Sequence, residues 1–437
     1  MNIYDYEGAF GAADMTSAAM RKAMGNWYQL YYGDRSRGDP CQKVAYTVVT
    51  KLIRAMFGEY AATGTTGFGQ SLVKAVESVR KEAVSQALVG GACFLKPCPG
   101  EKGFSFRVVA RPNVLIFARD AQGKVTDMGT VEKTTHGKYF YTLLERRTVD
   151  RQGYLTLRNT LYRSLNDRSL GQEVPLNSHP DYGDLVPGYV FSAPLNGVGL
   201  VELRTPILNC VDGSGEAVSV YAAAAELIGN IDENEAQLSG EFRRGQSRIV
   251  VSGDMLGAKG LEDHVFVGLD DDPEHVGITI FSPNLREQSF LARKQEYLRN
   301  VESIVGLKRG MLSDANMDER TATEIAASAG DFNLTVIDLQ HMWQEGLEAL
   351  LSLCGKLGAL YGLEGAGQPG EVSVDWGNGV LYDEDKTWEA YRTMVEKGLL
   401  KPEIALGWRF GRPAETKEQQ AKIREDLMPE SVLSIDN

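Results

Sequence analysis

The pattern of apolar positions predicts a long amphipathic helix at the centre of the chain, over residues 214–246. Apolar side chains recur there every three or four positions, which places them on one face of a helix. These positions are Ala217, Val220, Ala224, Leu227, Ile228, Ile231, Leu238 and Phe242. At about 1.5 Å per residue the helix extends roughly 50 Å, well beyond the globular average of ~12 residues. It therefore needs packing partners along its whole length.

A strand-rich segment, residues 247–283, separates this helix from a second one. Runs with strand character at 248–251 and 277–281 bound the segment, and glycines and an acidic run lie between them. The second helix is predicted over residues 284–309, because helical period starts after a proline and stops at Gly310. The apolar residues along one side of it are Phe290, Leu291, Tyr297, Leu298, Val301, Ile304 and Val305.

A loop and a third long helix follow. Residues 310–321 are polar and show neither strand nor helix period, which predicts a loop. Helical period resumes over residues 322–363, where Thr321 and Glu324 have the spacing of a capping box. The apolar face of this helix carries Leu334, Ile337, Trp343, Leu347, Leu350, Leu351, Cys354 and Leu357.

The chain on either side of this region mixes helices with strands. Residues 1–60 have helical period, and a glycine-rich turn at 64–71 precedes a predicted helix over 72–88. Between residues 92 and 162 the apolar residues recur at every second position, which predicts an antiparallel sheet. After residue 364 we expect a short strand followed by helices, with disorder over 429–437. The sequence therefore predicts an α+β fold.

The order of helix, insert, helix, loop and long helix resembles the portal proteins of tailed bacteriophages, of the siphophage type. That family forms the head-tail connector ring through which DNA enters and leaves the capsid. The run from Thr321 to Ile325 is similar to the start of the family's long helix, and Gly330-Asp331 marks its expected kink. The run from Leu170 to Leu176 is similar to a recurrent segment of the family.

The resemblance implies a division of the chain into seven parts. They are a wing of N-terminal helices and strands (1–213), a first stem helix (214–246), a clip (247–283), a second stem helix (284–309), a tunnel loop (310–321), a long kinked wing helix (322–363) and a C-terminal wing or crown region (364–437).

The resemblance also implies a function and partners. The chain is expected to form a homo-oligomeric ring, a dodecamer by family analogy, at one capsid vertex of the virion after assembly in the host bacterial cytoplasm. The ring is expected to be a channel for packaging and ejecting double-stranded DNA without sequence specificity. Its expected protein partners are the major capsid and scaffolding proteins, the terminase large subunit and a head-tail adaptor.

Charge is distributed unevenly along the central region. The clip segment contains two basic and seven acidic residues, whereas the second stem helix contains six basic and three acidic residues. On the portal interpretation the clip binds partners through Asp263, Asp270, Asp271, Asp272 and Glu274. The expected DNA contacts of stem and tunnel loop are Arg299, Lys308, Arg309, Asn316 and Arg320. A solvated loop and a helix with solvent-reaching basic side chains would have the same composition.

Composition narrows the class of protein further. The net charge of −13 argues against general adhesion to nucleic acid or to anionic membranes, and would let a duplex slide through a channel without sticking. The five cysteines include no C-x-x-C pair, so neither a disulfide framework nor a zinc site is indicated. No apolar run of about 18 residues occurs, so we expect no membrane association.

The sequence contains no recognisable catalytic or cofactor-binding pattern. The glycine-rich run at 64–71 lacks the lysine of a phosphate-binding loop, so nucleotide binding is disfavoured. The Asp270 to Asp272 triplet has no second carboxylate motif that would complete a two-metal site. The sequence therefore predicts no enzyme, no metal and no cofactor.

Two alternatives to a portal stay open. Another phage structural protein, such as an adaptor or scaffold, would be shorter as a rule and would lack the helix-insert-helix-loop-helix order. A nucleic-acid-processing enzyme would lose a metal-dependent nuclease activity on mutation of the Asp triplet.

Overall fold

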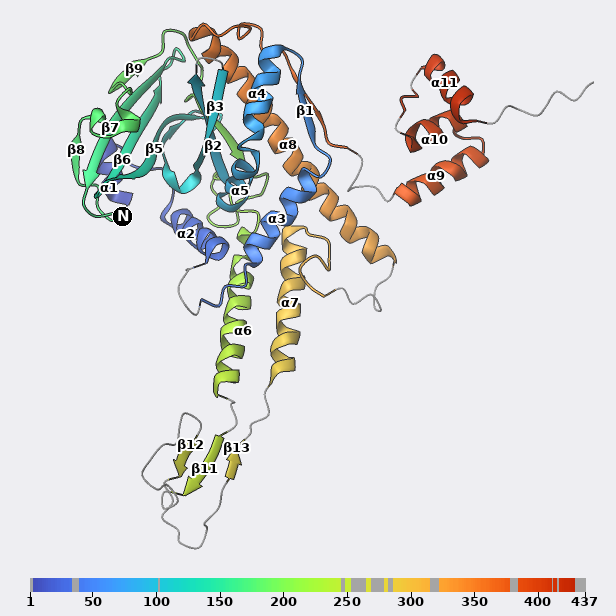
Figure 1. Ribbon diagram of the computed structural model, residues 1–437, viewed down its shortest axis with the longest axis horizontal. Coiled ribbons are helices and arrows are strands. Elements are labelled where there is room, and N and C mark those ends of the chain that lie inside the picture. The colour runs from blue at the N-terminus through green and yellow to red at the C-terminus, as the bar shows by residue number, and fades with distance from the viewer. Residues whose placement is uncertain are drawn as a thin grey trace, which may run out of the picture. The chain divides into compact units, whose positions relative to one another are not determined.

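The computed structural model describes residues 3–33, 39–100, 103–244, 248–252, 265–268, 279–281, 286–314, 322–377, 384–410, 412–414 and 416–428 (Figure 1). The chain forms two compact units. One consists of Met1–Met56 and Ala62–Val374, and the other of Phe57–Ala61 and Asp375–Asn437. Helices combine with mostly antiparallel sheets, so the fold is α+β, as the sequence predicts.

Five helices open the first unit. They are α1 (Ile3–Phe10), α2 (Ala18–Tyr32), α3 (Val44–Met56), α4 (Gly67–Glu77) and α5 (Arg80–Gly90). The Ser17 side chain starts α2 by accepting a hydrogen bond from the Met20 backbone N–H, and Gly33 ends the helix with a φ of 70°. Trp27 of α2 and Leu52 of α3 are fully buried, so both helices contribute to the core of the first unit.

The region predicted as one helix over 72–88 is two helices, α4 and α5. The Val79 backbone N–H bonds to the Val76 carbonyl three residues back, and the Ser78 hydroxyl bonds to the Ala75 carbonyl. These local hydrogen bonds tighten the turn and interrupt the helical pattern. The prediction of a single helix was therefore wrong.

The glycine-rich run is an ordered start of α4 rather than a separate turn. Thr66 caps α4 by accepting a hydrogen bond from the Gly69 backbone N–H, and its hydroxyl donates to the Pro369 carbonyl. A Cβ atom at Gly64 would lie 2.3 Å from the Gly69 backbone, so only glycine fits there. The first residue of the run, Gly64, ends strand β1 (Ala61–Gly64). This strand precedes α4 and pairs with β14 (Val372–Asp375).

The predicted antiparallel region forms two sheets. The first has the order β10-β2-β3 and contains β2 (Ala92–Gly100), β3 (Gly103–Ala110) and β10 (Val201–Arg204). The second has the order β4-β5-β6-β7-β8 and contains β4 (Val114–Arg119), β5 (Val125–His136), β6 (Tyr139–Val149), β7 (Leu155–Ser164) and β8 (Gln172–Val174), with β9 (Gly188–Val190) paired to β7. Turns at 120–123 and 150–153 connect β4 to β5 and β6 to β7.

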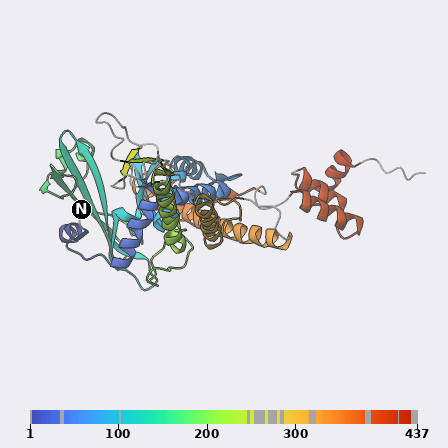
Figure 2. The same cartoon turned by 90° about the horizontal axis from the view of Figure 1, so that it is seen from below.

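Three long helices follow, namely α6 (Ala225–Arg244), α7 (Glu287–Val305) and α8 (Ala322–Leu360). Helices α6 and α7 lie side by side, which both views show (Figures 1 and 2). Helix α8 is unbroken through Gly330 and Asp331. The expected kink at these two residues remains a prediction.

The first of these helices begins later than its apolar period predicts. Residues 214–221 are not helical, and a single 3-10 turn (Ala222–Ala224) precedes α6. The backbone N–H of Val220 and the hydroxyl of Ser219 both bond to the Leu88 carbonyl at the end of α5, and the Thr205 hydroxyl bonds to the Val218 carbonyl. These tertiary hydrogen bonds replace helical ones, so the helix predicted from residue 214 was wrong at its start.

Between α6 and α7 the structure describes three short strands, β11 (Arg248–Ser252), β12 (Val265–Gly268) and β13 (Thr279–Phe281). Strand β11 lies in the middle, parallel to β12 and antiparallel to β13. Strands were predicted at both ends of this segment, where β11 and β13 lie, whereas β12 was not predicted.

The second unit contains three helices, α9 (Glu384–Glu396), α10 (Pro402–Arg409) and α11 (Lys417–Leu427). Gly398 follows α9 with a φ of 70°, and Pro402 occupies the first turn of α10. Thr416 and Gln419 form a capping box at the start of α11. Residues 429–437, where disorder was predicted, lie outside the described part of the chain.

Candidate functional site

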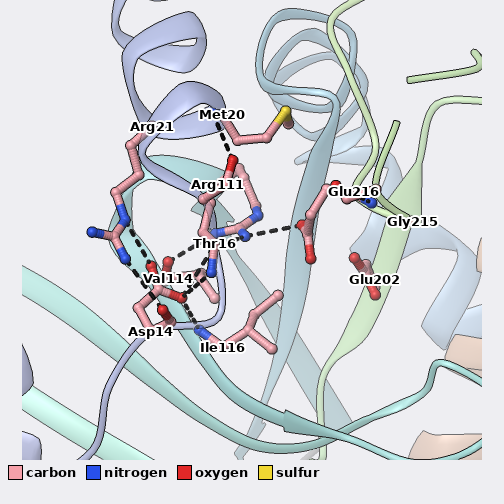
Figure 3. A network of polar contacts seen from close by, with 12 residues as sticks. Asp14, Thr16, Met20, Arg21, Arg111, Val114, Ile116, Glu202, Gly215 and Glu216 are labelled. Carbon is pink, nitrogen blue, oxygen red and sulfur yellow. Dashed lines mark hydrogen bonds and ion pairs between the residues drawn. The ribbon is translucent and has the colours of Figure 1, made fainter. Parts of the chain in front are cut away.

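A polar network fixes the segment that leads into α6 (Figure 3). The buried guanidinium of Arg111 donates hydrogen bonds to the Thr16 hydroxyl at 2.8 Å, the Val114 carbonyl at 2.9 Å and the Glu216 carboxylate at 3.0 Å. Arg119 donates to the other oxygen of Glu216, also at 3.0 Å. Arg111 thus ties the N-terminal segment and β4 to the chain just before α6.

Burial and the positive charge of the arginines have opposite effects on the two carboxyl groups near this network. Burial opposes ionisation of Glu216, but the positive charges of Arg111 and Arg119 outweigh burial and hold its pKa below the ordinary value. Burial dominates at the nearby Glu202, whose pKa is raised although Arg204 and Arg119 act in the opposite direction. Glu216 is therefore the anion that the network stabilises.

Polar contacts also hold α6 to α7 and to the loop before α3. Lys294 of α7 lies 3.2 Å from the Glu235 carboxylate of α6 and donates a hydrogen bond to the Gln42 side chain. The Asn234 amide of α6 donates to the Phe290 carbonyl of α7 at 3.1 Å. Asp232 accepts a hydrogen bond from the Gln42 backbone N–H at 2.7 Å. The helix pair is thereby fixed to the helical part of the first unit.

A groove of about 380 Å³ lies between α6 and α7. The guanidinium of Arg293 stacks over the Tyr297 ring at 4.7 Å, and that of Arg286 lies over the Phe290 ring at 5.8 Å. The α7 side of the groove is therefore basic and aromatic. The residues that line the groove are Asn230, Glu233, Asn234, Gln237, Arg286, Ser289, Phe290, Arg293 and Tyr297.

Four apolar residues predicted to be buried are exposed on these helices. Phe242 of α6, Leu291 and Ile304 of α7 and Leu334 of α8 are 42 to 62% exposed. Their predicted burial was wrong for the single chain, because the described residues of one copy leave these side chains partly open to solvent. Ile231 of α6 and Val301 of α7, by contrast, are fully buried.

The turn after α7 is organised around one buried carboxylate. Gly306 ends α7 in the left-handed conformation, with a φ of 73°. The side chain of Glu302, which is fully buried, accepts hydrogen bonds from the backbone N–H groups of Gly310, Leu312 and Ser313 and from the Ser313 hydroxyl. The start of the predicted loop is thus bonded to the last turns of α7.

The predicted DNA-contacting residues fall partly within the described chain. Arg299 is on α7, 28% exposed, and 3.9 Å from the Glu296 carboxylate on the same helix. Lys308 and Arg309 are exposed on the turn that Glu302 organises. Asn316 and Arg320 lie outside the described residues. The predicted clip residues Asp263, Asp270, Asp271, Asp272 and Glu274 also lie outside them.

Sequence reasoning missed Glu302, although the sequence contains a signal for it. Leu298, Val301, Glu302 and Val305 have the spacing of a single helix face, and all four are buried. A carboxylate within such a face needs partners for its oxygens. Arg111 carried no comparable signal, since its side-chain partners Thr16 and Glu216 come from distant parts of the chain.

The described residues contain neither a candidate metal cluster nor a membrane-spanning helix. Among them no group of three or more His, Cys, Asp or Glu residues could hold a metal ion. None of the helices described is both long enough and apolar enough to cross a membrane.

Comparison with known proteins identifies the family. None of the curated proteins compared with the chain matches it. A chain from the structure "Neck of native GTA particle computed with C12 symmetry" is similar at 14% identity and a TM-score of 0.49, over 94% of this chain and 99% of that chain. The family model described as "Phage portal protein, SPP1 Gp6-like" matches residues 73–429. The chain therefore belongs to the SPP1 Gp6-like family of phage portal proteins.

Proposed function

We propose that this protein forms a ring at one vertex of a phage capsid and is the channel for packaging and ejecting double-stranded DNA. The observation that carries the proposal is the helix pair α6 and α7, joined by a small strand-containing segment and followed by the long helix α8, in a chain of the portal family. The seven-part division into wing, stem, clip, tunnel loop, long wing helix and crown is proposed with it.

Exposed apolar residues support assembly of several copies into a ring. Phe242, Leu291, Ile304 and Leu334 leave large apolar side chains in water on three successive helices. Burying such side chains against a neighbouring copy gives about 25 cal/mol per Å² of apolar surface removed from water. A head-to-tail contact of this kind closes into a ring when its rotation allows closure. Twelve copies is the number proposed by family analogy.

A small number of cations supports transient DNA contact. We assign phosphate contact to Arg299, Lys308 and Arg309 of the described chain, and to Asn316 and Arg320 by their sequence position. Affinity for a duplex rises with the number of phosphates that a protein neutralises. So few phosphate contacts, in a chain of net charge −13, would let the duplex move along the channel.

The acidic segment between α6 and α7 is proposed as the docking face for other proteins. Its composition of seven acidic and two basic residues favours partners with basic surfaces. We assign the terminase large subunit and the head-tail adaptor to this face, and the major capsid and scaffolding proteins to the wing. The family is structural, and no catalytic role is part of the proposal.

Deletion of residues 314–318 tests the proposal in assembled phage particles. We expect rings and particles to form normally, while packaged DNA per particle falls and leakage of packaged DNA increases. A matched deletion of 166–168, in the exposed turn between β7 and β8, controls for shortening a surface turn. Failure of assembly would give the loop a structural role, and unchanged packaging and retention would contradict a channel role for it.

A further inference from the structure

We propose that Glu302 is a positioning residue, which holds residues 306–313 as one rigid turn and so presents Lys308 and Arg309 in fixed positions. This inference rests on the proposed function, because it gives the two cations a role toward phosphate. The structural part, the anchoring of the turn by a buried carboxylate, can be tested on the protein alone.

The Glu302 carboxylate meets a complete set of donors from one short segment. The Gly310 backbone N–H lies 3.1 Å from both oxygens, the Ser313 N–H is 2.8 Å from Oε1, and the Ser313 hydroxyl is 2.8 Å from Oε2. The Leu312 backbone N–H also donates to Oε1. Hydrogen bonds to an ionised acceptor are roughly twice as strong as neutral ones. One side chain therefore fixes three backbone positions that have no helical or strand partner.

Further contacts hold the same turn from its other sides. The Glu302 backbone carbonyl accepts hydrogen bonds from the N–H groups of Gly306 and Leu307. A Cβ atom at Gly306 would lie 2.3 Å from the Thr335 hydroxyl oxygen, so the turn packs tightly against α8. The Gln295 side chain of α7 accepts a hydrogen bond from the Asp314 N–H at 2.8 Å. The turn is thus fastened to both helices.

The chemistry of the donors explains why a carboxylate is required at this position. All the groups that face the side chain are N–H or O–H donors, and an ionised carboxylate offers acceptor sites on both oxygens. A glutamine would direct its NH₂ group at some of these donors, and an alanine would leave three backbone N–H groups without a partner. Of these N–H groups that of Ser313 is buried and those of Gly310 and Leu312 are partly buried, so either substitution should loosen the turn.

Rigidity matters for the two exposed cations. Lys308 and Arg309 lie within the turn, between the α7 end at Gly306 and the anchored residues 310–313. A cation on fixed backbone loses less conformational freedom on meeting a phosphate than one on a mobile loop. Glu302, which is buried and negatively charged, would therefore act on DNA only through the position of these two residues.

The first test measures amide hydrogen exchange in the purified protein without DNA, for wild type, Glu302→Gln and the control Glu287→Gln. Glu287 is an exposed residue of the same helix at its other end. We expect Glu302→Gln to speed exchange over 307–314 by roughly 10- to 100-fold, as loss of charge-assisted hydrogen bonds predicts, and Glu287→Gln to leave it unchanged. Unchanged exchange in Glu302→Gln would overturn the proposal.

Ser313→Ala keeps the test valid if Glu302→Gln does not fold. It removes one hydroxyl donor and leaves the carboxylate and the backbone donors in place, so we expect a smaller increase in exchange, confined to the same peptides. Exchange in that variant equal to wild type would show that the Ser313 contact does not restrain the turn and would contradict the proposal.

A second measurement separates the anchor from the proposed function. In assembled particles, Glu302→Gln and the double variant Lys308→Gln/Arg309→Gln should both lower DNA retention by a similar factor, while ring formation is kept. If exchange increases in Glu302→Gln but neither variant affects retention, the two cations do not act on DNA and the proposed DNA contacts fail. If only the double variant affects retention, positioning by Glu302 is refuted.

Discussion

Glu145 of β6 connects its sheet to the sheet of β2 through Lys96, and it also pairs with Arg147 of its own strand. Its carboxylate lies 2.8 Å from Lys96 Nζ of β2 and 2.7 Å from Arg147 Nε of β6. Burial opposes its ionisation, but the positive charges of Arg147 and Lys96 outweigh burial and lower the pKa of Glu145 from 4.5 to about 2. A carboxyl whose pKa falls on folding stabilises the fold above its unfolded pKa, and this contribution is lost as pH falls toward the folded value.

Glu145→Gln should lower the free energy of unfolding by about 3 kcal/mol at neutral pH, because the buried Arg147 and the partly buried Lys96 lose their anion. The difference in melting temperature between wild type and variant should narrow as pH falls below about 4.5, where the unfolded carboxyl takes up a proton. Differential scanning fluorimetry of both proteins, from neutral pH to below about 4.5, measures this difference in melting temperature. A difference that stays constant with pH would contradict an ionised Glu145.

The guanidinium of Arg111 donates hydrogen bonds to three partners at once, which leads to a second prediction. A lysine has a single ammonium group and cannot bond to Thr16, Val114 and Glu216 together. We expect Arg111→Lys to lower the free energy of unfolding by about 2–4 kcal/mol. Arg107→Lys is the matched control, since Arg107 is 60% exposed and its pair with Glu132 should contribute less than about 1 kcal/mol. Equal losses in chemical denaturation would contradict the network's role.

Glycines in and beside the long helices have opposite roles at the scale of elements. Gly306 has a positive φ and no room for a Cβ atom beside Thr335, whereas Gly330 lies inside α8 with open space around it. Gly306→Ala should therefore destabilise the protein by about 1–3 kcal/mol. Gly330→Ala should stabilise α8 by about 0.5–1 kcal/mol.

Thermal melts of the two glycine variants test whether the first substitution destabilises the protein and the second stabilises it. A lower melting temperature for Gly330→Ala would show that α8 needs a glycine there, as the expected kink requires. A melting temperature equal to wild type for Gly306→Ala would contradict the tight turn after α7.

Periodic elements could be predicted from the sequence, and elements set by tertiary hydrogen bonds could not. Helices α7 and α8 follow their apolar period to within a few residues of the predicted bounds. The start of α6 was misplaced because Ser219 and Val220 bond to Leu88 of a distant helix. Apolar spacing carries no information about such partners.

The candidate site was predicted in outline only. Lys308 and Arg309 were named as DNA contacts because basic residues beside a loop stand out in a sequence, and this role stays a prediction. Glu302 was not, since its role depends on backbone N–H groups that any residue at positions 310–313 would offer. Exposure of Leu291 and Ile304 was also missed, because an apolar stripe does not reveal whether its partner lies in the same chain or in another copy.

At the scale of the whole molecule, the exposed apolar residues of α6, α7 and α8 predict assembly. Leu291→Asp/Ile304→Asp should prevent ring closure, because it places charges where a neighbouring copy is proposed to pack. Both residues are 46 to 47% exposed in the single chain, so the melting temperature of the monomer should change little. Leu165→Asp, in the turn after β7 and 69% exposed, is the control and should still form rings.

Size-exclusion chromatography with light scattering compares the two variants. Rings formed by Leu291→Asp/Ile304→Asp would exclude these helix faces from the contact between copies, and loss of rings in both variants would point to an unspecific effect of an added charge.

Direct imaging of the wild-type protein tests the central claim, that copies of α6 and α7 stand side by side around a channel. The protein would be purified alone and after co-expression with scaffolding protein, then examined by mass photometry and negative-stain microscopy over a range of salt concentrations. We expect closed rings with an open centre and a mass of several copies. Monomers alone under all of these conditions would contradict it.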